Sequence, residues 1–154
     1  ASCRPHASTA GVALAAGHPH PRRGLIDLAL RRTSSGLNTP GRNGTPARTR
    51  YETRERFVAS ALVRTEPLTG RMHQIRTHLA ARGTPVLGDL QYGGSDLRGF
   101  RPRPPRLCLH AWRLRLPAEI AGDESSIECL VPEDLERYLD RLRGAGEGGA
   151  SARA

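Results

Sequence analysis

The chain contains no lysine, and this absence concentrates its positive charge in one type of side chain. All 24 basic residues are arginines, against 15 acidic residues, which gives a formal net charge of +9 and an isoelectric point of about 11.0. A guanidinium pairs with a phosphate through two parallel hydrogen bonds, so this balance favours a nucleic acid as partner over an acidic protein. A GC-rich genome would produce the same preference for arginine, and the two explanations are compatible.

Aromatic residues, long apolar runs and paired cysteines are also scarce. Aromatics make up 4% and hydrophobic residues 37% of the 154 residues, so the chain can build one domain with a small core. No apolar run approaches the ~20 residues that a membrane-spanning helix needs, so no membrane partner is expected. The three cysteines (Cys3, Cys108 and Cys129) form no Cys-x-x-Cys pair. We therefore expect reduced thiols, with neither a disulfide nor a metal site.

The densest pattern in the chain lies between residues 68 and 79, where the apolar spacing is helical. Met72, Ile75 and Leu79 follow one another at intervals of three and four residues, so they would share one buried face. The hydroxyl of Thr69 is suited to cap the first turn of this helix. A glycine and a proline a few residues after Leu79 would end it.

The polar residues of the predicted helix indicate a surface rich in hydrogen-bond donors. Arg71, Gln74 and His78 fall on a neighbouring face, with His73 and Arg76 to one side. Such donors suit phosphates and base edges, whereas the two histidines, five residues apart, lack the spacing of a helical zinc site. More arginines lie among prolines in a polar loop at residues 90–106. The predicted RNA-binding residues are Arg71, Gln74, Arg76, His78, Arg98, Arg101, Arg103 and Arg106.

Short strands account for most of the remaining pattern. They are predicted at residues 12–16, 24–30, 48–52, 56–64, 107–116 and 126–131, with an exposed loop at 31–47. Leu135, Leu139 and Leu142 would line one face of a last helix that ends at Gly144. The expected fold class is α/β in the broad sense, a mixed α+β domain with a mostly antiparallel sheet and a few helices. Residues 1–11 would be a ragged N-terminal end, 12–143 the domain and 144–154 a flexible tail.

The central helix belongs to a longer motif. Its residues are Gly70-Arg71-x-His73-Gln74-Ile75-Arg76-x-His78-Leu79, then Pro85-Val86-x-Gly88-Asp89 and Tyr92-Gly93. Together they resemble the third motif of the RluA-like pseudouridine synthases, of the RsuA/RluA superfamily. The resemblance covers residues 12–143, the C-terminal part of the catalytic domain. It implies isomerisation of uridine to pseudouridine in ribosomal or transfer RNA without a cofactor. It also makes Arg71, His73, Gln74 and Arg76 family motif positions.

The nucleophilic aspartate of this family has no counterpart in the sequence. The family carries it in a His-Arg-Leu-Asp block followed by Thr-Ser-Gly, whereas Asp27 is the only aspartate before Asp89. A tyrosine of the family falls at Gly11. No catalytic residue is therefore assigned. Because the family pairs this aspartate with an arginine, we expect Arg71 or Arg76 to lack an internal counter-charge and to be free to meet phosphate.

Three functions remain open from the sequence. The first is a pseudouridine synthase-like protein that is catalytically incomplete and binds ribosomal or other structured RNA, within a ribosomal or ribosome-assembly particle. The second is an active synthase on ribosomal or transfer RNA whose aspartate-bearing half lies outside this sequence. The third is a protein-interaction module on the same fold. Residues 1–26 contain no acid and resemble an organellar transit segment, so a mitochondrial and a cytoplasmic location both remain open.

Overall fold

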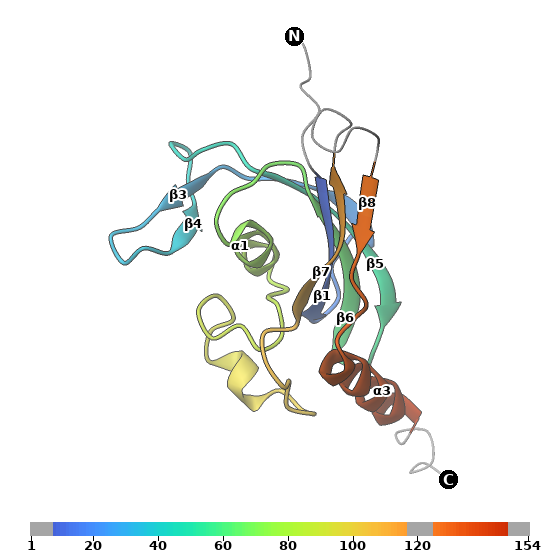
Figure 1. Cartoon of the computed structure of the whole chain (residues 1–154). Coiled ribbons are helices and arrows are strands. Elements are labelled where there is room, and N and C mark those ends of the chain that lie inside the picture. Colours follow the sequence, from blue (N-terminus) through green and yellow to red (C-terminus); the bar gives the residue numbers. More distant parts are fainter. Residues whose placement is uncertain (1–7, 117–124, 148–154) are drawn as a thin grey trace.

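The computed structural model describes residues 8–116 and 125–147, and its largest element is an antiparallel sheet (Figure 1). Six strands stand in the order β2-β5-β6-β1-β7-β8, and each neighbouring pair is antiparallel. Their bounds are Ser8–Ala16 for β1, Arg23–Asp27 for β2, Arg48–Arg56 for β5, Ser60–Pro67 for β6, Leu109–Leu116 for β7 and Ser125–Glu128 for β8. With the helices that pack on it, this sheet confirms the predicted mixed α+β class.

The alternation of side chains along β5 gives the sheet one face that is built for packing. Thr49, Tyr51 and Thr53 are buried, whereas Arg50 and Arg54 are exposed on the other side of the strand. Helix α1 (Gln74–Ala81) lies against the face of Thr49, and its Leu79 is only 1% exposed. The face that carries α1 is therefore the one that positions the family motif.

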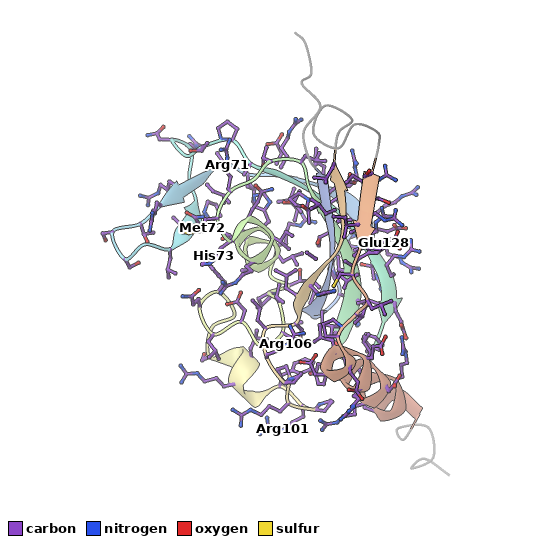
Figure 2. The ribbon with its side chains drawn as sticks, in the orientation of Figure 1. Arg71, Met72, His73, Arg101, Arg106 and Glu128 are labelled. Carbon is purple, nitrogen blue, oxygen red and sulfur yellow. The ribbon has the colours of Figure 1, made fainter. Side chains whose placement is uncertain are left out.

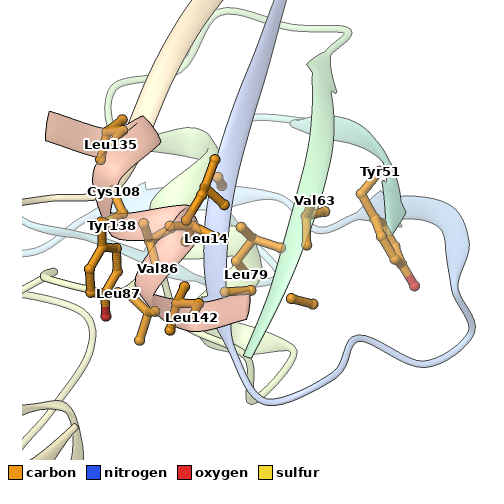
Figure 3. Close-up of a cluster of buried hydrophobic side chains, with 14 of the residues drawn as sticks. Leu14, Tyr51, Val63, Leu79, Val86, Leu87, Cys108, Leu135, Tyr138 and Leu142 are labelled. Carbon is orange, nitrogen blue, oxygen red and sulfur yellow. The ribbon is translucent and has the colours of Figure 1, made fainter. Parts of the chain in front are cut away.

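Helix α3 (Glu133–Glu147) covers one end of the opposite face (Figures 1 and 3). Its buried Leu135 and Leu139 pack beside Leu14 and Leu62, which are cross-strand partners in β1 and β6. Leu62 points away from α1, because successive side chains of a strand alternate between faces and the next residue pairs with buried Thr53. None of the helices that the structure describes is long and apolar enough to cross a membrane.

A separate two-stranded hairpin projects from the main sheet beyond α1 (Figure 1). It consists of β3 (Leu30–Arg32) and β4 (Asn38–Pro40), which pair antiparallel. The sequence predicted an exposed loop at 31–47, and the hairpin within that range corrects this prediction. The pattern failed because the hairpin buries only Leu30 among its strand residues, which leaves no alternation to detect.

Helix α1 begins later than predicted. His73 is its N-cap residue and has left-handed backbone angles (φ 53°), so the helix starts at Gln74. Thr69 does not cap it, because its hydroxyl accepts the Arg48 N–H (3.0 Å) and donates to Gln74 Oε1 (2.7 Å). Met72 therefore lies before the helix and is 44% exposed rather than buried. Gly83 (φ 74°) follows the helix end, as the sequence predicted.

Several boundaries also differ from the prediction. β1 begins at Ser8, within the stretch that was expected to be a ragged end, and its first residues pair with β7. β2 ends at Asp27, and Leu30 belongs to the hairpin instead. α3 continues through Gly144 to Glu147. The rest of the expected end and tail, residues 1–7 and 148–154, lies outside the described residues.

Candidate functional site

An ion pair between α1 and the turn that follows it forms the centre of the motif. Arg76 donates from Nε to Asp89 Oδ2 and from Nη2 to Asp89 Oδ1, both at 2.7 Å. The side chain of Arg76 is 13% exposed and that of Asp89 is 0% exposed. Arg76 therefore has an internal counter-charge, which corrects the expectation that it is free to meet phosphate. The two planar groups match because a guanidinium offers two parallel N–H donors.

Asp89 also organises the turn that holds it. Its Oδ1 accepts the backbone N–H groups of Gln91 and Tyr92, both at 3.0 Å. Burial alone would raise the pKa of Asp89, but the hydrogen bonds from Arg76 and from these two N–H groups outweigh it, so the pKa lies below its usual value. Gly88 is required just before it, because φ is 78° there and a Cβ would lie 1.9 Å from the Arg106 carbonyl oxygen.

Tyr92 joins this turn to two other parts of the chain. Its hydroxyl accepts the backbone N–H of Asn38 in β4 at 3.0 Å. The same hydroxyl lies 3.1 Å from His73 Nδ1, and the Tyr92 and His73 rings meet edge to face. The guanidinium of Arg76 lies 4.9 Å from the centre of the Tyr92 ring. Burial, with a smaller contribution from Arg76, lowers the pKa of His73.

The structure places Gln74 and His78 inside the molecule rather than on a donor-rich surface. Gln74 is 4% exposed and donates to Thr49 Oγ1 (3.0 Å), and it also donates to the Arg48 carbonyl (2.9 Å). His78 is fully buried between Thr49 Oγ1 (2.8 Å) and the Leu28 carbonyl (3.0 Å). Both side chains anchor α1 to β5, because a buried polar group needs a partner. Burial lowers the pKa of His78 despite opposing contributions from the Leu28 carbonyl and nearby Asp27.

The other predicted residues are exposed and lie on two sides of α1 (Figure 2). Arg71 precedes the helix and donates from Nε to the Pro46 carbonyl at 3.1 Å. Arg106 forms an exposed two-pronged ion pair with Asp134, which leaves it less available than the sequence suggested. Within the described part of the chain, Arg101 donates only to backbone carbonyls, and no described acidic residue forms an ion pair with it or with its neighbours Arg98 and Arg103.

Sequence reasoning missed three contributors to this site. Asn38 lies in a segment with no recognisable pattern, and Thr49 lies in a strand whose partner across the sheet could not be known. Asp89 offered a signal, because it is the only acidic residue between Glu66 and Asp96 in a segment with several arginines. Its pairing with Arg76 does not follow from their spacing along the chain.

Comparison with known proteins identifies relatives of this chain. The family model for RNA pseudouridylate synthase matches residues 7–81. The ribosomal large subunit pseudouridine synthase D of Nitrosomonas europaea is 40% identical over 105 residues, which cover 66% of this chain and 30% of that protein. The dual-specificity RNA pseudouridine synthase RluA of Escherichia coli is 38% identical over 125 residues, covering 77% of this chain and 54% of RluA.

A solved structure is similar over most of the fold. The human RNA pseudouridylate synthase domain containing 4 protein has a TM-score of 0.71 and 27% identity, covering 89% of this chain and 62% of that one. The chain therefore belongs to the RNA pseudouridine synthase family, of the RluA and RluD kind, and carries part of the family's catalytic domain. It spans about half the length of RluA and less than a third of the Nitrosomonas protein.

Proposed function

We propose that this chain binds structured RNA, ribosomal RNA first, through the surface around the first turn of α1, and that it does not isomerise uridine by itself. One observation carries the proposal. Two arginine-bearing segments, the hairpin and residues 90–106, lie on either side of α1, and α1 carries the family motif (Figure 1). No acidic residue that the structure describes forms an ion pair with Arg31, Arg42 or Arg98. Guanidiniums without carboxylate partners are available to phosphates.

The proposal assigns different roles to the arginines of the motif. Arg76 is held by two hydrogen bonds to Asp89, so it supports the turn beneath the proposed RNA-binding surface and does not bind phosphate itself. Arg71 is exposed, and among the described residues its guanidinium donates only from Nε, to the Pro46 carbonyl, so its Nη groups remain for RNA. Relatives named for ribosomal RNA and for RNA in general support RNA as the partner class.

The first test is binding to ribosomal RNA as a function of salt. We expect affinity to fall steeply with salt, and Arg71→Ala to reduce the slope by about one, because one phosphate contact is lost. Arg137→Ala is the matched control, since it removes an exposed arginine from α3 that pairs with Glu133. Absence of binding at low salt would contradict the proposal and would favour the protein-interaction module.

The second test is a single-turnover assay for pseudouridine with protein in excess over ribosomal RNA. We expect bound RNA and no product. Product would contradict the catalytic half of the proposal and would favour an active synthase. Asp27→Asn would then show whether Asp27, which lies close enough to His78 to affect its pKa, supplies the carboxylate.

A further inference from the structure

The hairpin and its flanking residues form a basic arm, defined here as residues 29–45. It carries Arg31, Arg32 and Arg42, and the sequence from 28 to 51 contains no aspartate or glutamate. All three side chains are exposed, and no described acidic residue forms an ion pair with them. The basic arm therefore presents charge that the rest of the described chain does not neutralise.

The basic arm is held together internally at both ends. At its tip, the Thr33 hydroxyl accepts the Leu37 N–H (3.1 Å), and the Thr33 N–H donates to the Leu37 carbonyl (2.7 Å). At its base, Leu30 and Thr45 exchange two backbone hydrogen bonds, at 2.9 and 2.7 Å. Gly44 allows this close approach, because a Cβ there would lie 2.5 Å from the Leu30 carbonyl carbon. The basic arm is thus tied together by its own hydrogen bonds at its tip and at its base.

Three contacts attach the basic arm to the residues around the start of α1. At the tip, the Asn38 N–H donates to the Tyr92 hydroxyl (3.0 Å), and Asn38 Nδ2 donates to the Met72 carbonyl. At the base, Arg71 Nε donates to the carbonyl of Pro46, the residue after the basic arm (3.1 Å). Figure 2 shows Arg71 and Met72 on the side of α1 that faces the hairpin. The two ends of the basic arm are therefore fixed to one short stretch of chain.

Tyr92 is itself fixed from three directions. Its N–H donates to Asp89, its ring lies against Arg76, and its hydroxyl meets His73 Nδ1. The backbone of His73 is left-handed (φ 53°), a conformation that is strained for a residue with a Cβ. The Tyr92 hydroxyl, which accepts the Asn38 N–H, is therefore held in place by contacts that lead back to the buried Arg76–Asp89 ion pair.

We propose that Tyr92 is a positioning residue: its hydroxyl aligns the basic arm with the first turn of α1, so that Arg31, Arg32 and Arg71 bind the backbone phosphates of one RNA. This inference rests on the proposed function. Each guanidinium adds to counterion release when it contacts a phosphate, so three arginines act on one RNA only if their positions match its phosphates. Holding the basic arm in place before RNA arrives removes the cost of ordering it on binding.

Tyr92→Phe tests the inference because it removes the hydroxyl and keeps the ring against Arg76. The matched control is Tyr51→Phe, which removes a hydroxyl that donates to the Pro21 carbonyl (3.0 Å), away from the basic arm. Hydrogen exchange of the Asn38 amide should be about fivefold faster in Tyr92→Phe, as one hydrogen bond is lost, and unchanged in Tyr51→Phe. An unchanged Asn38 amide would overturn the positioning role whether or not RNA binds.

The RNA readout is a double-mutant cycle. In the wild type, Arg31→Ser with Arg32→Ser should reduce the salt slope of RNA binding by about two. In the Tyr92→Phe background, Arg31→Ser with Arg32→Ser should reduce the salt slope of RNA binding much less, because the basic arm is no longer aligned. Equal effects in both backgrounds would overturn the inference while leaving the proposed function intact, and a wild type that binds no RNA would overturn the proposed function.

Asn38→Ala provides a second variant should Tyr92→Phe fold poorly. It removes the side-chain bond to the Met72 carbonyl, the second contact at the tip of the basic arm, and keeps the backbone N–H bond to the Tyr92 hydroxyl. It should weaken RNA binding in the same direction and again reduce the effect of Arg31→Ser with Arg32→Ser. Full additivity of the three substitutions would contradict a contribution of the Asn38 side chain to the alignment, and the Tyr92→Phe cycle decides the role of the hydroxyl.

Discussion

At the scale of single residues, the site depends on one buried acid and its partner. Asp89 neutralises Arg76 and ties down the N–H groups of the turn that carries Tyr92. Removal of either charge leaves the other without its partner in a mostly buried place, which costs more than the loss of a surface ion pair. Loss of the Arg76–Asp89 pair should therefore lower the stability of the fold, and it should weaken RNA binding as a consequence of that loss.

Asp89→Asn should lower the free energy of unfolding by about 3 kcal/mol at neutral pH, because it leaves Arg76 unpaired. The measurement is urea unfolding of both proteins between pH 7 and pH 3. The pKa of Asp89 is lowered in the folded state, so its stabilisation is complete above the unfolded value of about 3.9 and is lost as the pH falls below it. The difference between the two proteins should therefore shrink on acidification.

Asp134→Asn is the matched control for this experiment. Asp134 also pairs with an arginine, Arg106, but both side chains are well exposed. Solvent screens such a pair, so this substitution should change stability much less than Asp89→Asn. Equal losses in the two variants would contradict the central role of the Arg76–Asp89 pair.

At the scale of elements, α3 secures the end of the arginine-rich segment. Its Tyr138 donates to the Pro102 carbonyl at 2.7 Å, and Asp134 receives Arg106. Its apolar residues form a stripe on one face, and Leu135 is 4% exposed. The helix therefore both closes the core and holds residues 102–106 against its own surface.

Leu135→Ala should lower the free energy of unfolding by about 2 to 5 kcal/mol, since it leaves a cavity between α3 and the sheet. Chemical denaturation at neutral pH measures this loss. Glu136→Ala, at the next position on the exposed face, is the control and should be close to neutral. A loss in Leu135→Ala no larger than in Glu136→Ala would show that α3 does not pack as described.

At the scale of the whole molecule, some arginines pair with carboxylates and others do not. The exposed face of the sheet pairs many of its arginines with acids, such as Arg50 with Glu66 and Arg113 with Glu128. By contrast, the two segments that flank α1 keep arginines without carboxylate partners among the described residues. The strands of the main sheet also carry arginines without a described carboxylate partner, such as Arg64 and Arg115, so the two flanking segments hold only part of the uncompensated charge.

Replacement of Arg98, Arg101 and Arg103 by serine should reduce the salt slope of RNA binding by about three if each contacts one phosphate. The control removes the same charge from elsewhere, by replacing exposed Arg56, Arg137 and Arg141 with serine. Fluorescence anisotropy with ribosomal RNA between 50 and about 300 mM salt measures both slopes. The same slope for both triple variants would mean that only total charge matters, and the predicted RNA-binding role of residues 98–103 would be wrong.

Local patterns accounted for much of the fold. The strand positions, the end of α1 at Gly83 and the buried leucines of α3 follow from alternation, from a glycine that adopts positive φ and from helical spacing. The start of α1 did not follow, because the hydroxyl of Thr69 is engaged with Arg48 and Gln74. The hairpin escaped notice because nearly all its side chains are solvated.

The sequence alone determined the fold class, the excess of arginine and membership of the pseudouridine synthase family, since each depends on the order of residues along the chain. The tertiary structure decided which polar residues are available to a ligand. His78 and Gln74 became buried anchors, Arg76 acquired Asp89, and Tyr92 acquired Asn38. Burial and partner choice depend on segments that are tens of residues apart, and no local spacing encodes which of them meet.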